Sequence, residues 1–448
     1  MVGTENAMEY LLRPYLILLI LAVVTVSVLS TVNRKTPESS VLASATPTPG
    51  LIVQQPTATQ AVATATKPHF EDELDSSATK KSNGNGDMSS ILKDVGDEVE
   101  FIRGLTLGQQ LQPKFMSKYQ FTSDLENELD EDIENILNQQ YLMKLLDLIP
   151  ENSYLPDMLR DLYSEQVVGF YDTEADEMYL ISESELITPS DKTVIAHEYT
   201  HALQQEHFKI NDLMEGVEEN SGASDGLLAL IEGDAVMVQL EYMDTHLTSA
   251  EIDSMFKDDS SLQAFNDSPY ILQKMLSFPY DEGYTFVNFL RSRGGWEAVN
   301  LAYTTPPTST EQILHPEKYI MSEPPVAVVL PSLARSLGQG WTEVYDDVMG
   351  ELFIKTYLET HTYYNRAAVA AEGWGGDRFR VLHGPGDSYA FVSVVELDEE
   401  QDAMELLDVL GSIRSESHDR HVAVLGKRLF WIISTSSDIT NQIWKLFE

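Results

Sequence analysis

A short stretch of the chain combines two histidines and a glutamate at a spacing that suits metal chemistry. His197 and His201 are four residues apart, and Glu198 follows the first histidine. The stretch opens on the helix start signal PSD at residues 189–191 and carries apolar residues in helical phase. Side chains four residues apart lie on one helix face, so both imidazoles can reach one zinc ion at about 2.0–2.1 Å. Glu198 then stands beside the zinc-bound water as a general base.

This arrangement is the HExxH pattern of zinc metallopeptidases, in which the glutamate acts on water and does not bind the metal. The chain contains only 10 histidines, so a chance match on a well-formed helix is of the order of a few per cent. We therefore interpret His197 and His201 as ligands of one Zn²⁺ per chain and Glu198 as catalytic.

A catalytic zinc ion needs a third protein ligand and one open position. Glu232 lies in the segment LALIEGDA, beside the apolar stripe of a second predicted helix. A carboxylate there is costly to bury unless it meets a metal or a cation. Gly233 inside the same helix indicates that another backbone approaches closely. Glu232 is the predicted third ligand, and the weaker substitutes are Glu218, Glu219 and Glu241.

His207 offers an alternative third ligand of the metzincin type, HExxHxxGxxH, because it follows His201 by six residues. That pattern needs a glycine that breaks the helix, and this chain has Gln204 at the position. If the helix continues, His207 is rotated by about 240° from His201 and faces away.

The segments HEYTHALQ and ALIEGDA together resemble the gluzincin clan of zinc peptidases, the thermolysin-like class. Looser similarity to peptidase MA-like domains of uncharacterised bacterial, membrane-anchored members extends over residues 166–303. The resemblance implies a peptidase whose third zinc ligand is a glutamate on a following helix, which matches Glu232. Thermolysin-like enzymes carry an aspartate four residues after that ligand, where this chain has Val236. Asp225, seven residues before Glu232, lies on the suitable helix face instead.

A peptidase also needs a group that stabilises the oxyanion of its tetrahedral intermediate. In related enzymes a downstream histidine or tyrosine serves this purpose. His315, which precedes a proline after the segment TTPPT, is the predicted catalytic partner of Glu198, and Tyr280 and Tyr284 are its rivals.

The predicted fold class is α+β. Residues 91–358 are expected to form a mostly helical zincin-type metallopeptidase domain with a small sheet, to which the hairpin VVGFYD and EMYLISE belongs. Gly294 and Gly295 are expected to interrupt a later helix. Residues 359–448 alternate between strand and helix patterns and are predicted to form a small C-terminal α+β unit.

Residues 15–32 form an uncharged apolar run. As a helix this run is about 27 Å long, which suits a single membrane span. A cleaved signal peptide is the alternative. Residues 1–14 flank the run, and residues 33–90 read as a disordered linker rich in Thr, Pro and Ser. Flanking charges lean slightly towards a cytoplasmic body, but the stalk-like linker favours a single-pass protein of the cell membrane with an extracytoplasmic catalytic domain.

The composition of the chain disfavours or excludes several classes of function. The net charge of −43 disfavours nucleic-acid binding, and the absence of cysteine excludes disulfides, thiol nucleophiles and cysteine-ligated metals. The sequence thus predicts a zinc-dependent endopeptidase acting on peptides or proteins. The alternative is a non-catalytic, membrane-tethered binding protein on a zincin fold. Oligomeric state is not predicted.

Overall fold

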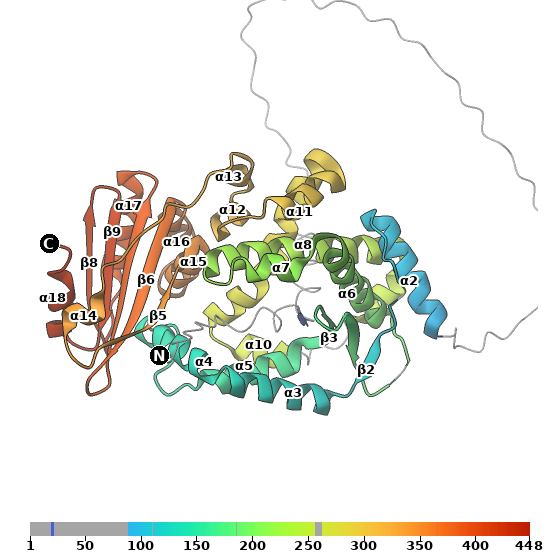
Figure 1. Cartoon of the computed structure of the whole chain (residues 1–448), viewed down its shortest axis with the longest axis horizontal. Helices are drawn as coiled ribbons and strands as arrows, with labels where there is room; N and C mark the ends of the chain where they lie inside the picture. Colours follow the sequence, from blue (N-terminus) through green and yellow to red (C-terminus); the bar gives the residue numbers. More distant parts are fainter. Residues whose placement is uncertain (1–18, 22–87, 110, 185, 256–261) are drawn as a thin grey trace, which may run out of the picture.

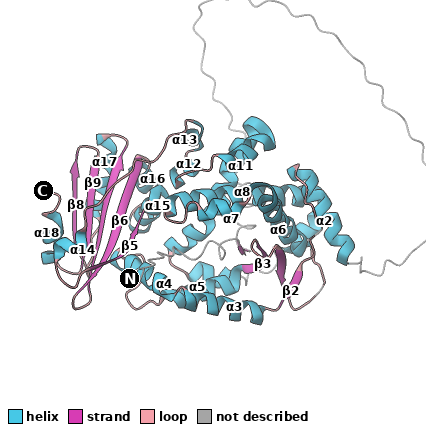
Figure 2. Ribbon diagram, viewed as in Figure 1, coloured by secondary structure: helices cyan, strands magenta, loops and turns pink. Residues whose placement is uncertain are grey.

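The computed structural model describes residues 19–21, 88–109, 111–184, 186–255 and 262–448, which form a mixed α+β structure rich in helix (Figure 1, Figure 2). The predicted membrane span 15–32 and linker 33–90 lie outside these residues, apart from β1 (Leu19–Leu21) and the first turn of α2. Among the described helices, none combines the length and apolar character that a membrane crossing requires.

Four helices form the centre of the molecule: α2 (Met88–Arg103), α6 (Pro189–Phe208), α8 (Ser221–His246) and α11 (Tyr270–Thr304), with the short α7 (Ile210–Glu215) between α6 and α8. Helix α6 begins with a capping box, in which the side chains of Thr188 and Asp191 each accept a hydrogen bond from the other's backbone N–H. Asn220 caps α8 through the backbone N–H of Ala223. The starts of both helices are therefore fixed by local hydrogen bonds.

Helices α8 and α11 cross in backbone contact. A Cβ atom placed on Gly233 would lie 2.2 Å from the carbonyl carbon and oxygen of Gly283, so only glycine fits at this crossing. The close approach predicted from Gly233 is confirmed. The predicted break in α11 is confirmed as well, because Gly295 has φ 64° and ψ −160°, a conformation that glycine adopts without steric cost.

A small sheet lies against α6. Its strand order is β1-β3-β4-β2, and the strands are β2 (Lys114–Met116), β3 (Val167–Asp172) and β4 (Glu177–Ile181) in addition to β1. Strands β3 and β4 pair antiparallel, as the hairpin prediction requires. Strand β1 pairs antiparallel with the outer side of β3. Gly169 of β3 faces α6 so closely that a Cβ there would lie 2.6 Å from Val194.

The C-terminal part is a five-stranded sheet of order β5-β6-β7-β9-β8 (Figure 2). Its strands are β5 (Thr342–Asp347), β6 (Trp374–Gly384), β7 (Ser388–Leu397), β8 (Asp419–Leu425) and β9 (Arg428–Ser434). Along β7, Phe391 and Val395 belong to one core cluster, whereas Ala390 and Val392 belong to another on the opposite face. Residues 359–448 contain both strands and helices, as expected, but the sheet starts before residue 359 because β5 pairs with β6.

Helices cover both faces of this sheet and connect it to the central helices (Figure 1). The C-terminal helices are α14 (Leu333–Leu337), α15 (Gly350–His361), α16 (Tyr364–Ala371), α17 (Glu400–Ser412) and α18 (Ser437–Trp444). The others are α3 (Lys118–Glu131), α4 (Ile133–Leu145), α5 (Leu155–Gln166), α9 (Ser249–Met255), α10 (Gln263–Asp267), α12 (Thr310–Leu314) and α13 (Pro316–Ile320). The acidic segment DLENELDEDIEN is divided between two helices, because Asp132 ends α3 and precedes α4.

Candidate metal centre

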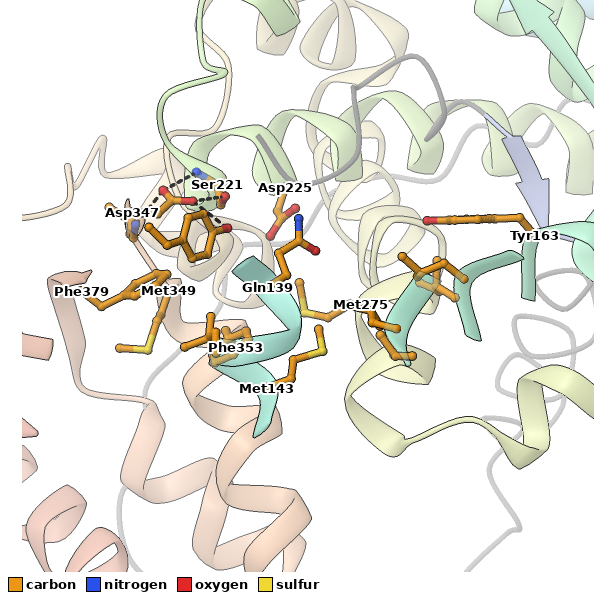
Figure 3. A pocket seen from close by; sticks show the side chains of 17 residues that line it. Gln139, Met143, Tyr163, Ser221, Asp225, Met275, Asp347, Met349, Phe353 and Phe379 are labelled. Atoms are coloured by element: carbon orange, nitrogen blue, oxygen red, sulfur yellow. Dashed lines mark hydrogen bonds between the residues drawn. The ribbon is translucent and has the colours of Figure 1, made fainter. Parts of the chain in front are cut away.

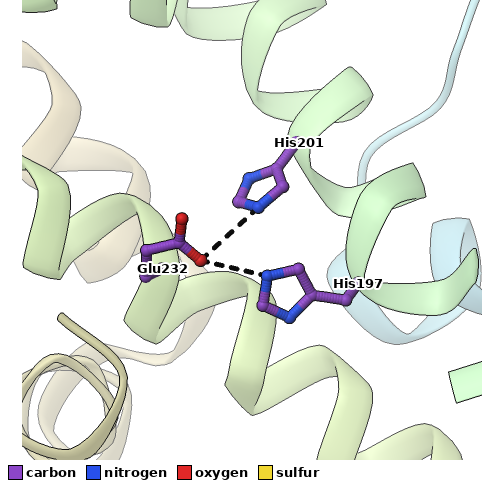
Figure 4. A group of neighbouring side chains, drawn as sticks. All are labelled: His197, His201 and Glu232. Carbon is purple, nitrogen blue, oxygen red and sulfur yellow. Dashed lines mark hydrogen bonds and ion pairs between the residues drawn. The ribbon is translucent and has the colours of Figure 1, made fainter. Parts of the chain in front are cut away.

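Two helices bring the three predicted zinc ligands together (Figure 4). Helix α6 supplies His197 and His201, and α8 supplies Glu232. The Oε2 atom of Glu232 lies 3.0 Å from Nε2 of His197 and 3.5 Å from Nε2 of His201. All three side chains are buried, and their ligand atoms lie within 4.8 Å of one another.

These distances fit a zinc ion. Two atoms bound tetrahedrally at about 2.0–2.1 Å from one ion lie about 3.3 Å apart, close to the two separations between Glu232 and the histidines. Oε1 of Glu232 is buried and has no hydrogen-bond partner among the described residues. A buried acceptor without a partner is costly, and a bound cation would satisfy it. The donor set of two imidazoles and one carboxylate is the set of catalytic zinc sites.

Glu198 lies on the same helix with its carboxylate entirely buried, and neither oxygen makes a well-formed hydrogen bond to another described residue. Burial raises its pKa to about 8, and the neighbouring His201 and the backbone of Tyr171 offset only part of that shift. Since Tyr171 belongs to β3, Glu198 lies between the two histidines and the small sheet. The Glu198 carboxylate is therefore available to a group that is bound beside the two histidines.

The pKa values of the two histidines shift in opposite directions. Burial lowers the pKa of His197. Burial has the same effect on His201, but attraction to the Glu232 carboxylate outweighs it and raises the pKa of His201 to about 9. The two histidines in turn hold the pKa of Glu232 low against the effect of its own burial. The Glu232 carboxylate thus favours positive charge beside it, which His201 supplies here and a bound metal ion would supply in its place.

Two glutamines set the orientation of the imidazoles. Nδ1 of His201 lies 2.9 Å from Oε1 of Gln204, and Nδ1 of His197 lies 3.4 Å from Oε1 of Gln239. An amide oxygen can only accept, so each ring carries a proton on Nδ1, and a metal ion that replaced the Nε2 proton would meet the Nε2 lone pair. Groups that fix the tautomer in this way are typical partners of metal-binding histidines.

The buried ion pair between Arg103 and Asp234 accepts a hydrogen bond from the side chain of Gln204. The amide of Gln204 donates to Ile231 O at 2.9 Å and to Oδ2 of Asp234 at 3.2 Å. Asp234 in turn accepts from the guanidinium of Arg103 in α2 and, at 2.9 Å, from the hydroxyl of Tyr303. The Arg103 guanidinium also stacks on Trp296, 4.4 Å from the ring centroid. Helices α2, α6, α8 and α11 therefore meet at Asp234.

Asp225 does not contact His197 or His201, although its position on the helix face suggested that it could orient one of these imidazoles. It lines an apolar cavity together with Ser221 and Asp347, and Gln239 contacts His197 in its place. Asp225 and Gln239 are each seven residues from Glu232, about 10.5 Å along the helix axis in opposite directions. His197 meets Gln239 on one side of Glu232, whereas Asp225 lies at the cavity on the other side (Figure 3).

The other candidate residues occupy separate positions. His207 is exposed near the end of an unbroken α6, with Nε2 2.8 Å from Thr106 O. His315 lies between α12 and α13 with Nε2 2.9 Å from Oε1 of Glu351, and no contact joins it to the three ligands within the described ranges. Tyr280 of α11 is the aromatic residue next to the centre, and its ring centroid lies 6.3 Å from that of His197.

A family model and a solved structure each match part of the chain. Residues 338–444 match the model of a family described as a domain of unknown function (DUF8575), a region that contains the C-terminal sheet. No curated protein matches the chain. A crystal structure from Chloroflexus aurantiacus, described as a proposed hydrolase with a novel fold, is 15% identical with a TM-score of 0.36. The match covers 52% of this chain and 88% of that one.

Proposed function

We propose that the protein is a zinc-dependent endopeptidase. One observation carries this proposal: the ligand atoms of His197, His201 and Glu232 converge around one point, beside a buried glutamate whose oxygens lack well-formed hydrogen bonds. Two histidines and a carboxylate leave a tetrahedral ion one open position. A base beside that position is what metal-assisted hydrolysis requires.

The chain's own groups have distinct roles in this proposal. When bound, the zinc ion would lower the pKa of water and polarise the scissile carbonyl. Glu198 accepts the proton of the attacking water and then passes it to the leaving amine. Gln239 and Gln204 hold the imidazoles in the tautomer that leaves Nε2 free for the metal. The burial of the centre excludes bulk water.

The outer side of β3 supports a binding mode for an extended peptide. Leu19 of β1 is opposite Phe170, so this edge of the sheet accepts an antiparallel strand from the chain itself. Glu198 lies near the backbone of Tyr171 on the same strand. A substrate that takes the place of β1 on β3 by main-chain hydrogen bonds would pass close to Glu198.

For the oxyanion, the contacts favour Tyr280 over His315. The ring of Tyr280 lies against His197, whereas His315 is hydrogen-bonded to Glu351 on α15. We therefore assign the stabilising role to Tyr280 within this proposal. Membrane attachment through residues 15–32 and an extracytoplasmic catalytic domain also remain proposals.

The test replaces Glu198 by Gln in the full-length chain, with Glu206→Gln as a matched control on the exposed face of the same helix. The measurements are zinc per chain and cleavage of an unfolded protein substrate such as reduced casein. We expect about one zinc in all three proteins, with cleavage by the wild type and the Glu206 variant and a loss of at least 10²-fold in the Glu198 variant.

Cleavage that persists in Glu198→Gln would reject Glu198 as the base. A wild-type protein that binds zinc but cleaves no peptide would favour the non-catalytic binding protein. A wild-type protein that takes up no zinc after reconstitution would overturn both.

A further inference from the structure

The candidate metal centre is closed in this structure. Its three candidate zinc ligands are buried, and Glu198 is 0% exposed. An extended peptide therefore reaches Glu198 only if a neighbouring segment moves away. Strand β1, dark blue in Figure 1, pairs with the outer side of β3, the strand whose Tyr171 backbone is close to Glu198. β1 is thus the segment at the edge where a peptide would bind.

β1 and an extended peptide would use the same backbone groups. Leu19 is opposite Phe170 and Leu21 is opposite Val167, in an antiparallel register. The other side of β3 pairs with β4, so the outer side supplies the main-chain hydrogen bonds that remain for a further strand. A peptide and β1 therefore cannot pair with β3 at the same time.

The pairing of β1 with β3 is short and irregular. β1 has three residues, whereas strands usually have about five or six, and its register with β3 shifts between Leu19 and Leu21. The pairing of β3 with β4 is continuous from Gly169 to Asp172 and does not involve β1. β1 can therefore leave β3 while the hairpin stays intact.

The residues of β1 also have a second possible location. They belong to the uncharged apolar run 15–32, which is long enough to cross a membrane as a helix. A residue cannot pair with β3 and lie in a bilayer at once, so the two locations exclude each other. Insertion of the run into a membrane would leave the outer side of β3 open.

We propose that β1 is an autoinhibitory strand, which covers the peptide-binding edge of β3 until a membrane takes up the apolar run that contains it. This inference rests on the proposed function, because it assigns β1 and the substrate to the same edge. Since β1 is part of the chain, it competes with a free peptide at a high effective concentration. The chain outside a membrane is therefore closed to substrate.

A disulfide tests the location of β1 without any measurement of activity. The chain has no cysteine, and opposite residues on antiparallel strands have Cα atoms about 4.5–5.5 Å apart, within the range of a disulfide. The full-length chain carrying Leu19→Cys and Phe170→Cys is made in a cell-free system without membranes and is oxidised at high dilution. Leu51→Cys with Phe170→Cys, outside β1, is the control pair.

Mass spectrometry should find the bond in the first pair, with at least tenfold less of it in the control pair. Phosphatidylcholine vesicles, present during synthesis, should reduce the bond in the first pair by a similar factor. A first pair that does not form the bond, or forms it equally with vesicles, overturns the proposal.

A binding experiment then tests whether β1 blocks the edge. It uses Glu198→Gln chains, so that nothing depends on cleavage, and fluorescein-labelled reduced casein as the probe. The chain locked by the bond between residues 19 and 170 should bind the probe at least about tenfold more weakly than the same chain after reduction with vesicles present. Equal binding, or no binding, in the two forms overturns the proposal.

A proline in β1 opens the edge in a second way. Ile20→Pro removes a backbone donor from β1 and should raise binding of the probe without vesicles, whereas Ile52→Pro, outside β1, should not. With Glu198 intact, vesicles should raise the cleavage of casein by the wild type at least about tenfold. A chain that binds the probe as expected but never cleaves it would retain the inhibitory strand and count against the endopeptidase alone.

Discussion

Arg103 and Asp234 form a fully buried ion pair, in which Nε and Nη2 of the guanidinium lie 2.8 and 3.0 Å from the two carboxylate oxygens. The pair joins α2 to α8 at the residue that also holds Gln204. Breaking a buried pair from one side leaves an uncompensated charge, so both stability and the orientation of His201 depend on it.

Replacement of Arg103 by Met should therefore lower the free energy of unfolding by about 3–5 kcal/mol, because the Asp234 charge stays buried without its partner. Urea unfolding of the zinc-free protein measures the effect. Arg160→Met is the control, since the pair of Arg160 with Asp157 is solvent-exposed and should cost less than about 1 kcal/mol. Equal losses in the two variants would contradict this account of Arg103.

Loss of the amide at Gln239 should weaken zinc binding. Gln239→Leu removes the acceptor for Nδ1 of His197, and such changes typically reduce metal affinity 10–100-fold. Gln239→Glu keeps an acceptor and should bind at least as tightly as the wild type, while Gln401→Leu on exposed α17 should have no effect. Competition with a chelator gives the three affinities. A conservative variant as weak as the leucine variant would show that Gln239 has only a packing role.

The crossing of α8 and α11 can be tested at Gly233. An added methyl group would meet backbone atoms of Gly283 at 2.2 Å, so Gly233→Ala should destabilise the protein by about 1–3 kcal/mol or more and displace Glu232. Gly411→Ala in α17 is the matched control, because nothing lies within 4 Å of its added Cβ. That variant should gain about 0.5–1 kcal/mol. If thermal unfolding shows Gly233→Ala to be more stable than Gly411→Ala, the close backbone contact between α8 and α11 is refuted.

Stability should fall as pH rises through the range in which Asp225 titrates. Burial, together with the charge of Asp347, raises the pKa of Asp225 to about 7 from 3.8. Between these two values the folded chain binds a proton that the unfolded chain has released, so the free energy of unfolding decreases with pH. The contribution is of the order of 2–4 kcal/mol, lost by about pH 7.

Asp225→Asn should remove this part of the pH dependence and stabilise the protein at pH 8 relative to the wild type. Urea unfolding at pH 5 and pH 8 measures both effects. Asp244→Asn, on the exposed face of the same helix, serves as the control. An unchanged slope in the Asp225 variant would place the pH dependence elsewhere in the protein.

The sequence predicted the part of the candidate site that depends on local geometry. His197 and His201 are one helical turn apart, so their common face follows from the helix alone. Glu232 is expected at this site because a carboxylate beside an apolar stripe needs a buried partner, and the structure brings it to the two histidines. The strands of the C-terminal sheet were found because their apolar residues alternate or run continuously.

Interactions between distant segments escaped prediction. Arg103 is 131 residues from Asp234, and nothing in its own neighbourhood marks it as buried. Gln239 has no metal-ligand signature, although its spacing of seven residues from Glu232 would have allowed it as a candidate. Strand β5 was missed because TEVYDD is dominated by acidic residues, which are depleted in strands.

The ion pair between Arg103 and Asp234 also sets the order in which the centre can be assembled. Contacts between residues so far apart in sequence pay a loop-closure entropy and tend to form late in folding. Until α2 has docked, the Asp234 carboxylate that accepts from Gln204 lacks its buried cationic partner. A nascent or partly unfolded chain therefore carries the motif without a finished centre. If the proposed zinc site is correct, it is complete only in the finished fold.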